Sequence, residues 1–379
     1  MASKLSDICG YAKGKTAVAG LTNQTYISTE NMIPNKGGIT TATTLPSSEY
    51  TQAYIKDDVL VSNIRPYFKK IWSAECDGGC SNDVLVFRAV EGVDPTFLYY
   101  VLADDNFFNY AMATSKGTKM PRGDKSAIME YVVPDFDIET QRKIGTLLRD
   151  IDQKIMVNCK INDNLQQQIS SIYANLCESK SWSSCELGTL IEVRDGTHDS
   201  PKPQTDGYLL VTSKHLLPYG VDRITPNRIA EKDFKKINER SLVEHGDVLM
   251  SMIGTIGLIS FVADHTIDYA IKNVALFKTS KTPEFAYYFL TFLKSKKTQQ
   301  YIEMCLAGST QKYISLSELR KMPIPDPDNE TLKSFNEIVR PMYQTIILNS
   351  QENNAFVELR DSLLPKLISG ELNVSDIDI

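Results

Sequence analysis

A long run of regularly spaced apolar residues most constrains what this 379-residue chain can fold into. Its apolar positions follow one another at alternating steps of four and three residues. This alternation is the a/d seam of a helix that packs lengthwise against another helix. No proline interrupts the run, and at about 1.5 Å per residue the helix would be too long to form one face of a compact core. The seam positions are Ile144, Leu148, Ile151, Ile155, Asn158, Asn162, Leu165, Ile169, Ile172 and Leu176.

A second copy of this seam lies 191 residues further along the chain. Its two asparagine layers, Asn349 and Asn353, repeat Asn158 and Asn162. A polar residue at a seam position lowers stability but specifies register. We therefore predict an intramolecular coiled coil whose register these four asparagines select. Direct contact of the asparagines with a partner or with DNA is the alternative.

The second copy is less regular than the first. Arg360 stands at a seam position that is otherwise apolar, and Pro341 and Pro365 lie within the helical pattern. Because proline cannot donate the helical hydrogen bond, Pro341 is predicted to start or kink the helix and Pro365 to kink its last turn.

The segments that precede the two seams also repeat each other. Residues 58–62 match 247–251, residues 82–87 match 272–277, and residues 95–100 match 283–288. The sequence predicts strands at 53–65, 83–89 and 131–134, and a short helix after Pro95. The predicted fold class is therefore α/β (α+β), with two tandem-duplicated mixed domains and two long helices. The predicted segments are 1–134, 135–181, 182–325 and 326–379.

Composition excludes several classes of protein. No apolar run reaches the ~18 residues that a membrane span needs, and the N-terminus is not a signal peptide, so we predict a cytoplasmic protein without a membrane partner. The seven scattered cysteines are predicted to be reduced and no metal site is expected. The net charge is −6, but the acidic excess lies in 326–379, with 10 acidic and four basic residues. A phosphate-binding face would thus have to be a local patch.

No pattern of catalytic residues stands out. The chain has no Gly-x-x-x-x-Gly-Lys-Ser/Thr loop and no Gly-x-Gly-x-x-Gly. The four histidines show no spacing that suggests a triad or a metal site. We predict a chain that is not itself an enzyme and that holds no cofactor.

Two strings point to a family. The sequence Asp-Gly-Thr-His-Asp-Ser-Pro at 195–201 and the terminal Leu-Arg-Asp-Ser-Leu-Leu-Pro-Lys-Leu-Ile-Ser-Gly-Glu-Leu at 359–372, with the two-copy arrangement, resemble the specificity subunit of type I restriction–modification enzymes. The resemblance implies that each globular segment is a target-recognition domain for one half of a bipartite DNA site. It also implies a pseudo-twofold antiparallel coiled coil that sets the half-site spacing.

The same resemblance implies the partners. Double-stranded DNA and two methyltransferase subunits would bind this chain, and restriction/translocase subunits would join the complex. S-adenosylmethionine, ATP and Mg²⁺ would be bound by those partner subunits. Two other interpretations stay open: the recognition subunit of a two-chain enzyme whose partner both modifies and cleaves, and a bivalent scaffold that binds protein or glycan.

Polar loops that differ between the two copies supply the candidates for DNA contact. Lysine and arginine can hold phosphates and pair with guanine, and asparagine and glutamine can pair with adenine. In the first domain the candidates are Arg65, Lys69, Asn82, Lys116, Thr118, Lys119 and Arg122. In the second domain they are Thr197, His198, Lys202, Lys214, His215, Lys272, Asn273, Gln311 and Lys312.

Overall fold

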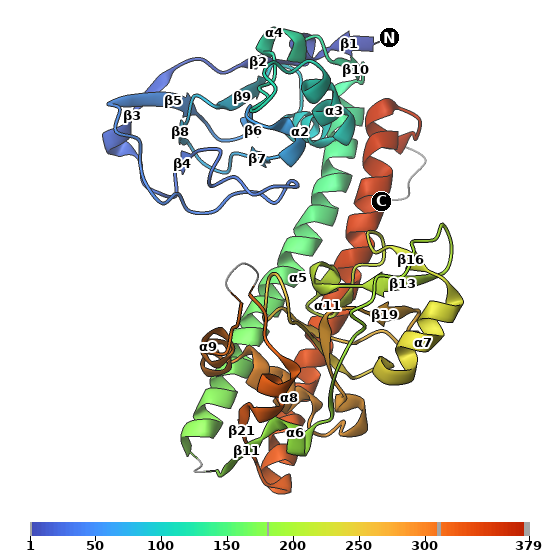
Figure 1. Cartoon of the computed structure of the whole chain (residues 1–379). Helices are drawn as coiled ribbons and strands as arrows, with labels where there is room; N and C mark the ends of the chain where they lie inside the picture. Colours follow the sequence, from blue (N-terminus) through green and yellow to red (C-terminus); the bar gives the residue numbers. More distant parts are fainter. Residues whose placement is uncertain (1, 180–181, 309–311, 375–379) are drawn as a thin grey trace. The chain divides into compact units, whose positions relative to one another are not determined.

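Two compact units make up the chain in the computed structural model, which describes residues 2–179, 182–308 and 312–374. Unit 1 comprises residues 1–156 and 353–379, and unit 2 comprises residues 157–352. The two predicted long helices are present as α5 (Ile138–Ser179) and α11 (Asn329–Ser369), and each contributes residues to both units (Figure 1).

Unit 1 contains a central antiparallel sheet in the order β2-β9-β6-β7. A second sheet has the order β3-β5-β8-β4, in which only the β4–β8 pair is parallel, and β1 pairs with β10. The strands are β1 (Ala2–Lys4), β2 (Cys9–Tyr11), β3 (Lys15–Ala17), β4 (Tyr26–Ile27), β5 (Tyr50–Tyr54), β6 (Val59–Ser62), β7 (Ile71–Ser73), β8 (Gly78–Cys80), β9 (Val84–Ala89) and β10 (Val132–Pro134).

Short helices cover the central sheet of unit 1. Strand β9 contributes Leu85 and Phe87 to a buried cluster that also contains Phe97 of α2. Ile144 of α5 and Leu367 of α11 belong to the same cluster, so both long helices complete this core. The short helices are α1 (Leu5–Ile8), η1 (Val18–Gly20), η2 (Pro66–Phe68), α2 (Pro95–Ala103), α3 (Asp105–Ala113) and α4 (Lys125–Ile128).

Unit 2 repeats this plan. Its central antiparallel sheet has the order β12-β20-β17-β18, and β11 pairs with β21 as β1 pairs with β10. A second sheet has the order β16-β13-β19, and β14 pairs with β15. The strands are β11 (Ser184–Glu186), β12 (Val193–Asp195), β13 (Tyr208–Val211), β14 (Leu216–Leu217), β15 (Gly220–Val221), β16 (Arg228–Ile229), β17 (Val248–Ser251), β18 (Ile259–Phe261), β19 (Tyr269–Ile271), β20 (Val274–Phe277) and β21 (Pro323–Pro325).

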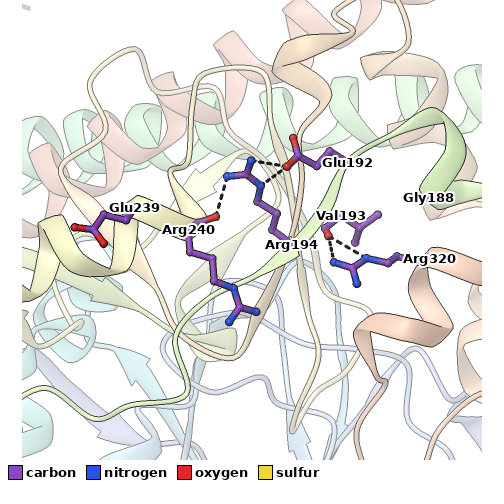
Figure 2. A pocket seen from close by; sticks show the side chains of 7 residues that line it. All are labelled: Gly188, Glu192, Val193, Arg194, Glu239, Arg240 and Arg320. Atoms are coloured by element: carbon purple, nitrogen blue, oxygen red, sulfur yellow. Dashed lines mark hydrogen bonds and ion pairs between the residues drawn. The ribbon is translucent and has the colours of Figure 1, made fainter.

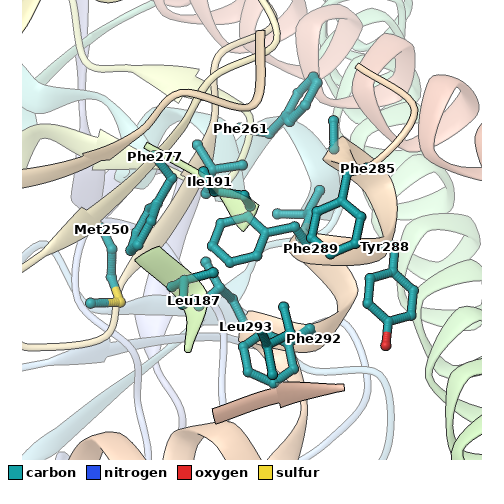
Figure 3. Close-up of a cluster of buried hydrophobic side chains, with 14 of the residues drawn as sticks. Leu187, Ile191, Met250, Phe261, Phe277, Phe285, Tyr288, Phe289, Phe292 and Leu293 are labelled. Carbon is teal, nitrogen blue, oxygen red and sulfur yellow. The ribbon is translucent and has the colours of Figure 1, made fainter. Parts of the chain in front are cut away.

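Aromatic side chains dominate the core of unit 2 (Figure 3). Phe277 of β20 packs edge-on against Phe289 of α8, with ring centroids 4.9 Å apart. Tyr173 of α5 and Phe335 of α11 join the same core, with centroids 6.3 Å apart. The helices are α6 (Leu187–Leu190), η3 (Ser213–His215), α7 (Glu231–Ser241), η4 (Thr279–Lys281), α8 (Ala286–Lys294), α9 (Lys296–Met304) and α10 (Leu316–Lys321).

An ion pair with a buried aspartate occupies the same framework position in each unit. Asp58 accepts two hydrogen bonds from Arg88 in unit 1, at 2.7 and 2.6 Å. Asp247 accepts one from Lys278 in unit 2, at 2.6 Å. The shared strand order and these equivalent pairs confirm the predicted fold class of duplicated mixed domains with long helices.

The long helices run antiparallel within each unit. In unit 2, Asn158 contacts Glu352 and Asn162 contacts Asn349, so numbers rise along α5 as they fall along α11. In unit 1, Arg360 donates to Asp152 at 2.8 Å, which satisfies the one charged seam residue.

One proline prediction needs correction. Helix α11 begins at Asn329 and continues without a break through Pro341 and Pro365. Pro341 therefore does not start it. The apolar seam packs on neighbouring residues such as Val339 and Tyr343, both buried, and this packing outweighs the loss of one backbone donor.

The predicted strand at 53–65 is also interrupted. Strand β5 ends at Tyr54 and β6 begins at Val59, with Asp57 between them at φ 70°. Asp58 accepts from the backbone N–H of Ile55 at 2.8 Å, and this side-chain bond stabilises the turn. A left-handed residue, Arg65 at φ 51°, then redirects the chain after β6.

Candidate nucleic-acid interface

A five-residue loop closes against the end of the central sheet in unit 1. Lys116 and Arg122 exchange backbone hydrogen bonds of 2.9 and 3.0 Å, so residues 117–121 project between them. The backbone N–H of Arg65 donates to the carbonyl of Pro121 at 2.8 Å. The structure thus brings Arg65 beside the predicted loop. Thr118 and Lys119 at its tip are exposed.

Exposed ion pairs hold the other predicted cations of unit 1. Arg122 pairs with Asp83 at 3.0 Å, next to the exposed Asn82. Lys116 pairs with Asp124, and this bond lowers the pKa of the Asp124 carboxyl. A third pair joins Lys69 to Asp105 at 2.7 Å. Exposed pairs of this kind contribute little to stability, so a phosphate can replace the carboxylate at small cost.

A hollow lined by hydroxyl groups includes Asp83, the ion-pair partner of Arg122. The sequence pattern did not predict this hollow. Its volume is about 410 Å³. Asn31 fixes its wall, because the side-chain amide donates to the carbonyl of Thr40 at 2.8 Å. Hydroxyl groups are common donors to DNA phosphates. The hydroxyl-bearing residues of its lining are Tyr26, Ser28, Thr29, Thr40, Thr41, Thr43, Thr44 and Ser81.

Unit 2 closes an equivalent loop. Ala307 and Tyr313 exchange backbone bonds of 2.9 Å each, and Ile314 donates to the carbonyl of Met252 at 3.1 Å. Lys312 is exposed on this loop. Gln311 lies outside the described residues.

The string at 195–198 takes part in a polar cluster of unit 2. Asp195 ends β12 with a buried side chain, and it accepts hydrogen bonds from Arg240 and from His198, the latter at 3.1 Å. His198 Nδ1 lies 2.7 Å from Asn273 Oδ1. A side chain at position 196 would place its Cβ 2.3 Å from the carbonyl oxygen of Ile271, which explains Gly196.

The remaining predicted residues of unit 2 are divided between this cluster and other places. Lys272 donates to Ser200, and Thr197 accepts from the backbone of Asp199 at 3.1 Å, so both lie in the cluster. Lys202 and Lys214 are exposed.

His215 differs from the other predicted residues. It is only 3% exposed, and its Nδ1 accepts from the backbone N–H of Thr212 at 3.0 Å. Burial lowers its pKa. His215 is therefore not part of the candidate interface, because its ring is buried.

Three arginines converge on a hollow of about 570 Å³ that the sequence pattern did not reveal (Figure 2). Arg194 donates to Glu192 and to the carbonyl of Arg240, and Arg320 donates to the carbonyl of Val193 at 2.8 Å. Ion pairing with Lys281 and Arg194 lowers the pKa of Glu192. No short motif connects these positions, so only folding could bring them together.

Three of the four predicted register residues make hydrogen bonds between the long helices in unit 2. Asn349 donates to Asn162 Oδ1 at 2.9 Å, and Asn158 donates to Glu352 at 2.7 Å. Asn158 and Asn162 are both buried, whereas Asn353, which belongs to unit 1, is partly exposed. Their role in selecting register remains a prediction.

Known proteins resemble this chain in both sequence and structure. A family model for the type I restriction modification DNA specificity domain matches residues 180–356. The type I restriction enzyme MjaIX specificity subunit of Methanocaldococcus jannaschii is 27% identical over 325 residues, which is 76% of this chain and 71% of that protein. The HindI specificity subunit of Haemophilus influenzae is 21% identical, covering 92% of this chain and 94% of that protein.

The fold comparison agrees with these relatives. The crystal structure of the type I restriction–modification S subunit from M. genitalium aligns with a TM-score of 0.57 at 16% identity, covering 97% of this chain and 96% of that one. Within the described ranges no helix is both long and apolar enough to cross a bilayer. Residues 180–356 thus match the DNA specificity domain of type I restriction–modification enzymes, and most of the chain is similar to the specificity subunits of those enzymes.

Proposed function

We propose that this chain is the non-catalytic DNA-recognition subunit of its complex, and that each recognition domain reads one half of a bipartite site. One observation carries the proposal. In both units a pair of backbone hydrogen bonds closes the chain at the same point of the framework, between Lys116 and Arg122 and between Ala307 and Tyr313, but the sequences between these pairs differ. Equal scaffolds with unlike loops are suited to reading two unlike half-sites.

The domain division follows from the same reasoning. We propose recognition domains at 1–134 and 182–325 and spacer helices at 135–181 and 326–379. The antiparallel helices would set the distance between half-sites, in a pseudo-twofold arrangement. They would also dock two methyltransferase subunits, and the exposed apolar side chains of Val157, Ile161 and Leu348 in unit 2 are suited to such contacts.

Methyl transfer and DNA cleavage would be carried out by the partner subunits. S-adenosylmethionine, ATP and Mg²⁺ would be bound by the methyltransferase and restriction/translocase subunits, in the cytoplasm where the DNA lies. The purified chain alone should therefore neither methylate nor cut DNA. Turnover by a homogeneous sample of this chain would contradict that part of the proposal.

Exchange of one recognition domain tests the proposal. Residues 182–325 would be replaced by those of a relative with another specificity, and methylation sites would be mapped in a host that carries the chain and its modification partner. We expect one half-site to change and the other to stay. If both halves change, the domain assignment is wrong.

Salt dependence separates DNA recognition from the scaffold alternative. Each phosphate that the protein binds releases counterions, so the logarithm of the binding constant should fall steeply with the logarithm of salt concentration. Replacing both Lys119 and Arg122 by alanine should reduce that slope by about one unit for each phosphate that the variant no longer binds. An unchanged slope would place this loop away from the DNA.

A further inference from the structure

Both ring nitrogens of His198 face oxygen atoms. Nε2 lies 3.1 Å from Asp195 Oδ2, and Nδ1 lies 2.7 Å from Asn273 Oδ1. A neutral imidazole has one N–H donor and one acceptor nitrogen, whereas the imidazolium has two donors. The observed arrangement therefore fits a charged His198. With a neutral ring protonated at Nε2, the Asn273 amide must turn so that its NH₂ group faces Nδ1.

Asp195 determines which ring nitrogen of His198 is protonated in both the neutral and the charged form. Its carboxylate is buried and can only accept, and it accepts from Arg240 as well as from His198. His198 Nε2 must then remain protonated in both charge states. The proton that comes and goes is the one on Nδ1, which faces Asn273.

The charge of His198 thus sets the orientation of the Asn273 amide. When His198 is charged, Asn273 Oδ1 accepts from it, and Nδ2 is the atom left to donate to another group. When His198 is neutral, Nδ2 donates to the ring, and Oδ1 is the atom left to accept from another group. Histidine changes charge between about pH 5 and pH 8, within the range in which DNA binding can be measured.

The place of Asn273 in the framework connects this amide with the proposed interface. Asn273 matches Asp83 of unit 1, which pairs with Arg122 of the equivalent loop. It adopts a left-handed conformation at φ 53° immediately before β20. Asp195 and His198 line a hollow of about 360 Å³ beside Asn273, which does not itself line it.

Other charged groups also face this hollow. Asp233, Lys236 and Arg240 line it from α7, and Asp199 lines it from the loop after β12. Lys272, beside Asn273, is engaged with Ser200. Arg240 contacts Asp195, and among the described residues the hydrogen bonds to the His198 ring come from Asp195 and Asn273.

We propose that Asp195, His198 and Asn273 form a protonation-dependent specificity element, in which Asn273 is the specificity-determining residue and Asp195 a positioning residue. The proposal rests on the proposed function of DNA recognition. In the major groove guanine and thymine present acceptors, whereas the amino groups of adenine and cytosine are donors. One base position should therefore favour guanine or thymine at pH 6 and adenine or cytosine at pH 8.

The test measures base preference at two pH values. The full chain, assembled with its modification subunits, would be bound to duplexes randomised at each half-site position. At one position in the half read by unit 2, the ratio of guanine-or-thymine to adenine-or-cytosine should fall at least about fivefold from pH 6 to pH 8. A ratio that is independent of pH at every position would overturn the proposal.

Asp195→Asn supplies the decisive variant. Arg240 can only donate, so the oxygen of the new amide will face Arg240 and its NH₂ will face His198 Nε2. Neutral His198 then carries its proton on Nδ1, and Asn273 Oδ1 stays inward. The variant should show the wild-type pH 6 preference at both pH values, and retention of the pH response would contradict the element.

His245→Gln is the matched control. His245 stacks on His265 with ring centroids 4.4 Å apart and takes no part in the cluster, so the pH response should survive. If the pH response is lost in His245→Gln, the response depends on His245 and not on His198, and the proposal is overturned.

A measurement without DNA covers the case in which Asp195→Asn does not fold. Nitrogen-15 spectra of the wild-type chain at pH 8 should show neutral His198 protonated at Nε2, with the signal assigned by its absence from His198→Gln. Protonation at Nδ1 would overturn the element itself. A complex that shows the expected tautomer but binds no DNA would instead refute the proposed function.

Discussion

The two units differ in how deeply the cation of their equivalent ion pair is buried. Lys278 is 2% exposed and Asp247 is fully buried, and Glu244 also pairs with Lys278 at 2.7 Å. The corresponding Arg88 of unit 1 keeps 39% of its side chain exposed beside the buried Asp58. Water can therefore solvate the cation of unit 1 but not that of unit 2.

The first prediction compares one change at these two equivalent sites. Asp247→Asn should lower the free energy of unfolding by about 3–5 kcal/mol, because it leaves a buried cation with only one carboxylate. Asp58→Asn should cost clearly less, since Arg88 can turn toward solvent. Urea unfolding of both variants measures the difference, and equal losses would show that burial of the cation is not the cause.

The second prediction concerns pH and Lys294. Its ammonium group donates to Tyr219 Oη at 3.0 Å, and burial lowers its pKa to about 8. Since the unfolded-state pKa is about 10.4, the unfolded chain binds more protons between these values, and stability from this group rises with pH. Wild type should therefore gain on the order of 2–3 kcal/mol over Lys294→Met between pH 7 and pH 10.

Denaturant unfolding at the two pH values measures this gain. Lys296→Met is the control, because Lys296 is exposed two residues away and should leave the pH dependence of wild type unchanged. A parallel pH dependence in wild type and Lys294→Met would contradict burial as the cause of the shift.

The long helices combine apolar and polar contacts at the scale of elements. Asn162 receives a hydrogen bond from Asn349, and its own amide lies 3.4 Å from both the carbonyl of Ile346 and the hydroxyl of Ser350. Ile346 and Val339 of α11 are buried. The asparagine layer is thus a hydrogen-bonded step within an apolar seam, which is the arrangement that favours one register over others.

The third prediction is a double-mutant cycle on that layer. Asn162→Leu and Asn349→Leu should each destabilise the chain by about 1–3 kcal/mol, because each breaks the hydrogen bond between the buried Asn162 and the half-buried Asn349. The double variant should recover most of the loss, since two leucines pack without an unpaired polar group. Additive losses in denaturant unfolding would mean that the two amides do not interact.

The two units are connected through α5 and α11, which each contribute residues to both. Each unit combines one mixed domain with part of α5 and part of α11, because the helices are antiparallel. Leu176 packs against the core of unit 2, so an insertion there would disturb that core. A change of length must be made in both helices, after Met156 and after Glu352.

The fourth prediction is a paired insertion of one heptad at these two points. Seven residues add about 10.5 Å and turn the helix by about 20° relative to a perfect heptad. At about 3.4 Å per base pair the spacer between half-sites should lengthen by about three pairs. Binding to duplexes whose spacer varies one pair at a time measures the optimum. An unmoved optimum, with the insert shown to be helical, would mean that the helices do not set the distance.

Local pattern was enough to predict the duplicated framework and the two long helices. The alternation of steps that begins at Ile144 depends only on the helical repeat, and matches such as 58–62 with 247–251 depend only on a shared scaffold. It was not enough to predict the path through Pro341, where packing of the seam outweighs the preference of one residue. Nor did it predict the break before β6, which depends on the Asp58 side chain.

For the polar cluster around His198, the sequence also predicted some features, and the tertiary structure decided the others. The sequence identified Thr197, His198, Lys272 and Asn273 as polar loop residues, because unlike loops on a repeated scaffold are visible in the sequence itself. The tertiary structure decided that His198 lies between Asp195 and Asn273, that Arg240 reaches Asp195 from α7, and that His215 is buried. The contacts of His198 with Asn273 and of Arg240 with Asp195 join residues far apart in the chain, and their hydrogen bonds depend on distances that only the packed sheets and helices establish.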